Sequence, residues 1–231
     1  MTVLALNDLA TRLPSLEGRV AAVSGAGAGS GRASAELLAR LGAAVGVLDV
    51  DGARAEAIVS AIRDAGGRAL ALCADVSSES ELERAASALD DRFGPCEVLV
   101  NDAELALAGP LEEIALEDWD RMIEVELTGA FLCMQVFGRR MLAHRGGAVV
   151  NVCAAHGESP LEQLPGAAGR TMLSRLGAVE WGARGVRVNS VHVGGGADPA
   201  AVAAAVAFLS GDGSSYVTGE SFEVNEEVPI G

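Results

Sequence analysis

The chain has 231 residues, of which 50% are hydrophobic and only 3% aromatic, and its formal charge is −15. This length and apolar content predict one domain with a sizeable core of small and branched aliphatic side chains. The acidic balance, with no basic run longer than Arg139-Arg140, argues against nucleic acid and anionic membranes as partners. The N-terminus has no basic flank or long apolar segment, so neither a signal peptide nor a membrane span is predicted.

Short apolar runs alternate with longer stretches of helical periodicity along the whole chain. The predicted strands are Arg19–Ser24, Ala44–Asp49, Arg68–Cys73, Glu97–Asn101, Ala148–Cys153, Val186–Val191 and Ser221–Asn225. The predicted helices lie near 30–41, 52–65, 79–92, 117–144, 167–183 and 199–210. This alternation favours one α/β domain with a doubly wound, Rossmann-like parallel sheet and helices on both faces. We expect residues 1–17 to form an N-terminal extension and residues 18–231 to form the domain.

A glycine-rich turn follows the first strand and opens the first long helix. It reads VSGAGAGSGRASAELL and fits the pattern Ser24-Gly25-x-x-x-Gly29-x-Gly31, although not the strict G-x-G-x-x-G. Glycines at such a turn let the backbone approach a pyrophosphate at the helix N-terminus. Asp49 ends the second strand, where an acid can bond a ribose 2′-hydroxyl. The pattern indicates a dinucleotide-binding origin, and a tight turn without a ligand is the alternative.

The longest predicted helix carries a carboxylate within its apolar face. Its apolar side chains recur at three- and four-residue steps: Trp119, Met122, Ile123, Leu127, Ala130, Met134, Phe137 and Met141. Glu126 falls inside this stripe, where a charged side chain is seldom buried without a partner. We therefore expect Glu126 either to reach an arginine or histidine, or to have its pKa raised by desolvation. Arg170 is a candidate partner.

Two features of composition limit the chemistry. All 17 basic residues are arginine, so nothing that requires a lysine ammonium or a Schiff base can occur. The four cysteines lie in apolar runs without C-x-x-C spacing: Cys73, Cys96, Cys133 and Cys153. They predict reduced core residues of a cytoplasmic protein, and no metal site is expected.

Several motifs along the chain belong together: the Ser24-Gly25-x-x-x-Gly29-x-Gly31 turn, Asp49, Asp75-Val76, VNDAE at 100–104, EDWDRMIEVELTGAF at 117–131, GVRVNSVHVGG at 185–195 and the C-terminal segment ending in VNEE. Through these motifs the chain resembles the short-chain dehydrogenase/reductase family from about Leu16 to Asn225. The resemblance implies seven strands in the order 3-2-1-4-5-6-7. It also implies NAD contacts from eight residues: Ser24, Gly25, Gly29, Gly31, Asp49, Asp75, Val76 and Asn101.

The resemblance also marks where the family places its catalytic groups. The family uses a tyrosine as general acid/base, a lysine that lowers its pKa, a serine that polarises the carbonyl and an asparagine that holds a relay water. Counting back from Asn189, these four fall respectively at Gln163, Ala167, Ala154 and Glu126. A shorter loop between 155 and 169 shifts Gln163 by three or four residues at most. The only tyrosine is Tyr216, so the family's proton transfer is predicted to be lost.

Further departures affect the cofactor and the substrate. Glu104 replaces a glycine of the family motif and adds a negative charge near the expected diphosphate. Val193 replaces the proline before Gly194, and Asp198-Pro199 then starts the next helix almost at once. The family has a substrate lid between these points, so a shortened lid is predicted. NAD binding is accordingly expected to be weakened or lost.

These observations leave three hypotheses of different classes. The first is a catalytically inactive subunit that assembles with an active family member, or otherwise with itself, through the two long helices and the C-terminal helix and strand. The second is a repurposed non-redox enzyme, an isomerase, dehydratase or cyclase, that uses Glu126 with His156 or Cys153. The third is a sensor that binds NAD or an adenine nucleotide without turning it over.

Overall fold

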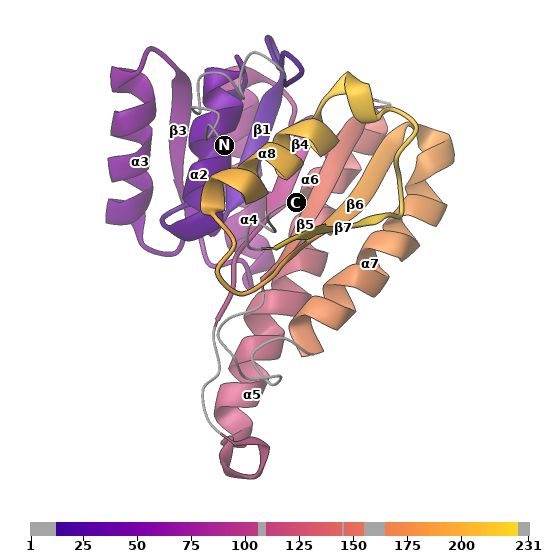
Figure 1. The fold of residues 1–231 in the computed structure, drawn as a ribbon. Coiled ribbons are helices and arrows are strands. Elements are labelled where there is room, and N and C mark those ends of the chain that lie inside the picture. Colours follow the sequence, from indigo (N-terminus) through magenta and orange to yellow (C-terminus); the bar gives the residue numbers. More distant parts are fainter. Residues whose placement is uncertain (1–12, 106–109, 145, 155–164, 226–231) are drawn as a thin grey trace, which may run out of the picture.

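The computed structural model describes residues 13–105, 110–144, 146–154 and 165–225. Its seven strands are β1 Val20–Ser24, β2 Ala44–Asp49, β3 Arg68–Cys73, β4 Val98–Asn101, β5 Gly147–Ala154, β6 Val186–Val193 and β7 Ser221–Val224. They form one sheet in the order β3-β2-β1-β4-β5-β6-β7, and every neighbouring pair is parallel. The predicted α/β fold and its strand order are confirmed (Figure 1).

The helices cover both faces of the sheet, as a doubly wound fold requires. They are α2 Gly29–Arg40, α3 Gly52–Asp64, α4 Glu79–Phe93, α5 Leu116–Ile123, α6 Gly129–Ala143, α7 Pro165–Trp181 and α8 Pro199–Ser210. One core cluster joins side chains of α2, α3 and α8 to the sheet, and a second joins those of α4, α6 and α7. The central strands are buried on both faces, which explains their continuous apolar runs.

The predicted helix 117–144 is interrupted in the structure. Between α5 and α6 the residues Glu124–Thr128 form a π-helical turn, η2. A π turn inserts an extra residue and rotates the side chains that follow, and such turns are frequent at functional sites. Glu126 lies in this turn and is buried, whereas α5 projects away from the sheet (Figure 1). The expectation of a single regular helix was wrong at this point.

Several shorter predictions can be compared directly with the structure. Asp198 caps α8, since its Oδ1 accepts the amide of Ala200 at 2.9 Å and Pro199 is the first helical residue. Only residues 194–198 separate β6 from α8. Of the predicted extension, residues 1–12 lie outside the described residues, and Leu16 is buried in the core beside α2. Cys73 was predicted to be a core residue but is exposed, because β3 is an edge strand.

Among the described residues, no helix is both long enough and apolar enough to cross a membrane.

Candidate functional site

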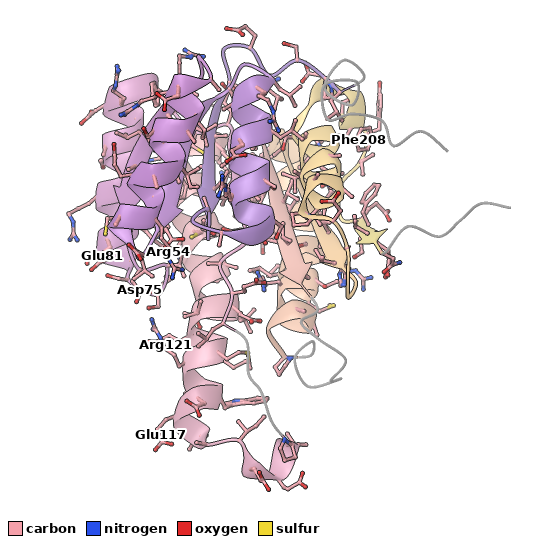
Figure 2. The ribbon with its side chains drawn as sticks, turned by 60° about the vertical axis from the view of Figure 1, so that its left-hand side comes forward. Arg54, Asp75, Glu81, Glu117, Arg121 and Phe208 are labelled. Atoms are coloured by element: carbon pink, nitrogen blue, oxygen red, sulfur yellow. The ribbon has the colours of Figure 1, made fainter. Side chains whose placement is uncertain are left out.

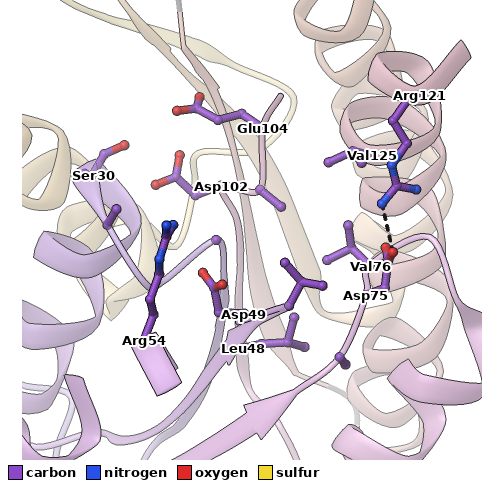
Figure 3. A pocket seen from close by; sticks show the side chains of 16 residues that line it. Ser30, Leu48, Asp49, Arg54, Asp75, Val76, Asp102, Glu104, Arg121 and Val125 are labelled. Atoms are coloured by element: carbon purple, nitrogen blue, oxygen red, sulfur yellow. Dashed lines mark hydrogen bonds and ion pairs between the residues drawn. The ribbon is translucent and has the colours of Figure 1, made fainter. Parts of the chain in front are cut away.

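A cleft of about 330 Å³ opens at the carboxyl ends of β1 to β4 (Figure 3). This edge is where ligands bind in open parallel sheets. Its walls come from the glycine turn, the ends of β2 and β3, the segment after β4 and the α5–η2 helix: Gly25, Ala28, Gly29, Ser30, Leu48, Asp49, Val50, Arg54, Ala74, Asp75, Val76, Asp102, Ala103, Glu104, Arg121 and Val125. None of the lining residues comes from β5, α7 or β6.

The glycine turn is too tightly packed to accept side chains. A Cβ on Gly25 would lie 2.6 Å from the carbonyl oxygen of Asp102, and one on Gly31 would collide with the carbonyl of Gly25. Gly25 and Gly29 also have positive φ values of 67° and 54°, which disfavour other residues. The turn therefore brings the N-terminus of α2 to the floor of the cleft. Packing explains Gly25 and Gly31 of the sequence pattern, and the positive φ explains Gly29.

Asp49 connects the glycine turn to the end of β2. Its Oδ2 accepts the amide of Gly27 at 2.9 Å, and its Oδ1 accepts the amide of Asp51 at 2.9 Å. Each carboxylate oxygen has a second lone pair, so Asp49 can still accept a hydroxyl from a ligand in the cleft. Of the eight residues that the resemblance assigned to NAD, five line the cleft: Gly25, Gly29, Asp49, Asp75 and Val76.

Asp75 is held by Arg121, an interaction that the sequence did not predict. Arg121 on α5 donates to Asp75 Oδ2 at 2.9 Å, and the amide and hydroxyl of Ser77 donate to Oδ1 at 2.9 and 2.6 Å (Figure 3). Burial raises the pKa of Asp75, but the hydrogen bonds from Ser77 and Arg121 outweigh it and lower that pKa below its ordinary value. Figure 2 shows Arg121 pointing from α5 toward Asp75.

The other assigned residues lie behind the cleft. Asn101 Nδ2 donates to Asn151 Oδ1 at 2.8 Å, and Asn151 Nδ2 donates to Ser174 Oγ at 2.8 Å. This buried chain of hydrogen bonds ties the end of β4 and the middle of β5 to α7. Ser24 contributes the hydroxyl that accepts the amide of Asp102 at 3.2 Å. The structure thus gives Asn101 and Ser24 supporting positions.

A buried ion pair lies beside the cleft, between the π turn and α7. Arg170 Nη2 is 3.6 Å from Glu126 Oε2, and Arg170 Nη1 donates to the carbonyl of Ala103 at 3.4 Å. The side chain of Arg170 is only 1% exposed and that of Glu126 11% exposed. The expectation that Glu126 reaches an arginine such as Arg170 is confirmed.

Gly166 lets the carboxylate of Glu126 approach the first turn of α7, because any Cβ at that position would collide with it. A carboxylate there is favoured by the unpaired amides and the dipole of the helix N-terminus. Ala167 is the next residue of α7, and Arg170 lies one turn further along the helix. The position that the resemblance gave to a lysine therefore carries a methyl group, and the nearest cation on α7 is Arg170, which pairs with Glu126.

The ends of β5 and β6 carry a second polar group of residues. His192 Nε2 and Thr171 Oγ1 are 2.9 Å apart, Thr171 donates to the carbonyl of Ala167 at 2.9 Å, and Cys153 Sγ lies 4.0 Å from Thr171 Oγ1. Since the Thr171 hydroxyl donates elsewhere, His192 is the donor in their contact. Burial raises the pKa of the Cys153 thiol, so Cys153 stays a neutral thiol near pH 7.

Two of the predicted site residues, His156 and Gln163, lie outside the described residues, and Ala154 is described only as the last residue of β5. In the part of the chain that the structure describes, no group of three or more histidine, cysteine, aspartate or glutamate side chains could hold a metal ion. The structure does not bring Cys153 or Glu126 into the lining of the cleft.

The model of the short chain dehydrogenase family matches residues 19–205. The chain belongs to the short-chain dehydrogenase family. D-threitol dehydrogenase of Mycolicibacterium smegmatis is 32% identical over 240 residues, which cover 91% of this chain and 92% of that protein. A (2S)-[(R)-hydroxy(phenyl)methyl]succinyl-CoA dehydrogenase subunit, BbsD of Thauera aromatica, is 32% identical over 184 residues, with 78% and 73% covered.

Solved structures give the same result. A hydroxysteroid dehydrogenase from Escherichia coli superposes with a TM-score of 0.87 at 25% identity, with 93% of this chain and 98% of that chain covered. These three relatives are named as dehydrogenases, so the chain descends from a family of oxidoreductases.

The family typically binds NAD or NADP, and the cleft fits one end of such a dinucleotide. Asp49 and Asp75 offer carboxylate oxygens to a ribose and an adenine amine, and Leu48, Val50 and Val76 offer apolar walls. At the other end, the carboxylates of Asp102 and Glu104 point toward the side of the cleft that carries Ser30 (Figure 3). These carboxylates and apolar walls therefore fit adenosine well and a diphosphate poorly.

Proposed function

We propose that this protein is a catalytically inactive member of the family, a pseudo-dehydrogenase, that assembles with an active member and stabilises or regulates it. The observation that carries the proposal is the Glu126–Arg170 ion pair. The family's asparagine position holds a buried carboxylate, and the cation nearest the family's lysine position neutralises that carboxylate. Proton transfer to a carbonyl requires a positioned acid whose pKa is matched to the task. The only tyrosine, Tyr216, is fully exposed and does not line the cleft.

An exposed apolar stripe supports a role in assembly. Met172, Leu176 and Val179 follow one another at four- and three-residue steps on α7 and are 59%, 55% and 82% exposed. Apolar residues at these steps share one face of a helix. Phe131 on the neighbouring α6 is also exposed. Contiguous apolar surface of this kind marks interaction sites in soluble proteins, and the resemblance assigns these two helices to subunit contacts.

Two observations favour a different chain as the partner over a second copy. The formal charge of −15 makes copies of this chain repel each other. A relative that is 32% identical is named as a subunit of a dehydrogenase, so the family includes members that work within multi-subunit enzymes. In such an assembly the oxidoreductase activity, with NAD as the cofactor, would belong to the partner. A homo-oligomer is the alternative.

We include a cytoplasmic location in the proposal. None of the four cysteines forms a disulfide, as expected in a reducing compartment.

The second hypothesis, a repurposed enzyme that uses Glu126 and His156, gains no support from the described residues because Glu126 is engaged by Arg170.

The test is purification of the tagged full-length protein from its native host at low expression. We expect a second short-chain dehydrogenase with an intact Tyr-x-x-x-Lys to co-elute in stoichiometric amount. The paired substitution Leu176→Glu and Val179→Glu should release it, whereas Ser60→Glu, an exposed position on α3 at the other face of the sheet, should retain it. A pure homo-oligomer, or an assembly that the α7 changes leave intact, would contradict the proposal.

A further inference from the structure

The cleft holds more acidic than basic side chains. Four carboxylates line it, those of Asp49, Asp75, Asp102 and Glu104, together with two guanidinium groups, those of Arg54 and Arg121. Both arginines have partners of their own: Arg54 Nε is 3.2 Å from Asp51 Oδ2, and Arg121 pairs with Asp75. The cleft therefore has an acidic balance before any ligand enters it.

The acidic residues divide between two regions of the cleft. Asp49 ends β2, and Asp75 follows the neighbouring strand β3 by two residues. The apolar side chains of Leu48 and Val76 line the same region. Asp75 already accepts three hydrogen bonds, and one lone-pair direction of its carboxylate is left for an exocyclic amine. This region matches the polar edge of an adenine and the hydroxyls of its ribose.

The second region faces the N-terminus of α2. The residue Asp102 is only 4% exposed, and its Oδ2 would lie 3.0 Å from a Cβ on Gly31, within the first turn of that helix. The favourable field of the helix N-terminus thus already acts on a carboxylate of the protein. The family motif has an asparagine and a glycine where this chain has Asp102 and Glu104, so both differences add negative charge.

These charges act where the 5′ substituent of a bound adenosine would lie. A phosphate placed against two carboxylates in a partly buried cleft is repelled more strongly than in water, because the local dielectric is lower. A hydroxyl is not repelled, and an ammonium group is attracted. The two carboxylates thus lower the affinity for a phosphorylated ligand as well as raising it for a cationic one.

We propose that the cleft binds an adenine nucleoside whose 5′ substituent carries no negative charge, and that Asp102 and Glu104 reject phosphorylated forms, NAD included. This goes beyond the proposed subunit function. The ligand site lies at the β1–β4 end and the assembly surface on α6 and α7, so either proposal can fail while the other stands.

The experiment is calorimetric titration of the purified full-length protein at pH 7 and low ionic strength. The ligands are 5′-amino-5′-deoxyadenosine, adenosine, AMP and NAD⁺, which differ mainly at the 5′ position. We expect the protonated amine to bind at least tenfold more tightly than AMP, with adenosine between them and NAD⁺ no tighter than AMP. Added salt should reduce the differences in affinity among the four ligands, because it screens the charges.

The paired substitution Asp102→Asn and Glu104→Gly should raise the affinity for AMP at least tenfold and leave that for adenosine within about twofold. Asp91→Asn, outside the cleft, alters the net charge but should leave the order of affinities unchanged. Asp75→Asn should weaken all four ligands alike. Binding of AMP or NAD⁺ to the wild-type protein as tight as that of adenosine would overturn the proposal, as would the absence of adenosine binding at millimolar concentration.

Discussion

The carboxyl ends of the strands differ between the two halves of the sheet: one half borders an open cleft, and beside the other a buried ion pair fills the space. At the carboxyl ends of β1 to β4 a cleft is open, the glycine turn forms part of its lining, and Asp49 and Asp75 keep hydrogen-bonding capacity. Next to it, between η2 and α7, the space is filled by Glu126, Arg170 and the first turn of α7. A binding surface needs only shape and acceptors, whereas proton transfer needs particular groups at fixed positions. One half can therefore keep its role after the other has lost it.

The largest expected effect comes from breaking the ion pair. Arg170→Ala would leave the carboxylate of Glu126 buried without its cation, and we expect the free energy of unfolding to fall by about 3–5 kcal/mol. Urea unfolding at pH 7 measures this. Replacing both partners, Glu126→Gln with Arg170→Met, should restore most of the loss because no buried charge remains. If Arg170→Ala lowers the free energy of unfolding by less than about 1 kcal/mol, the pair is solvated and does not fill the space between η2 and α7.

The next effect concerns the glycine turn of the open half. Gly31→Ala would push a methyl group into the carbonyl of Gly25, and overpacking of this kind costs about 1–3 kcal/mol. It should lower the urea midpoint and weaken adenosine binding together. Gly182→Ala, where a Cβ meets nothing within 4 Å, is the control and should change the stability by less than about 0.5 kcal/mol. Equal effects at the two glycines would contradict the packing argument.

The smallest effect is a dependence on pH at the Asp75–Arg121 pair. The pKa of Asp75 is lowered in the folded protein, so the pair stabilises the fold above the ordinary value of 3.8. That stability is lost as the pH falls through the lower folded value. Arg121 is 44% exposed, and pairs of this kind contribute about 0.2–1 kcal/mol.

Arg121→Ala should therefore lower the free energy of unfolding slightly at pH 6 and by less at pH 2.5. Unfolding curves of the two proteins across this range measure the difference. A gap between them that grows as the pH falls would have the wrong sign for this mechanism.

Much of the fold could be predicted because its signals are local. The apolar runs at Ala44–Asp49 and Arg68–Cys73 match β2 and β3 residue for residue. The pairing of Glu126 could also be anticipated, since a carboxylate in an apolar stripe needs a partner and Arg170 was a plausible one. In each case the neighbours along the chain carried the main information: the apolar runs mark the strands, and the apolar stripe shows that Glu126 needs a partner.

The rest depended on contacts between distant segments. Arg121 reaches Asp75 from 46 residues away, and nothing in the helix pattern distinguishes it from any other exposed arginine. The π turn at Glu124–Thr128 has no sequence period of its own, and Cys73 is exposed only because β3 lies at the edge of the sheet. The burial of Asp102 against α2 likewise follows from how β4 ends beside β1.

The central claim is that the half of the sheet beside Glu126 and Arg170 has lost catalysis. Its most direct test is to disable each chain of the native assembly in turn. The measurement is the rate of NAD-dependent turnover of the purified assembly on the alcohol or ketone that it accepts. We expect Tyr→Phe in the partner's Tyr-x-x-x-Lys to abolish turnover, and Glu126→Gln with Arg170→Met in this chain to leave the rate per partner chain unchanged. Turnover by this chain alone, lost on changing Glu126, would contradict the account.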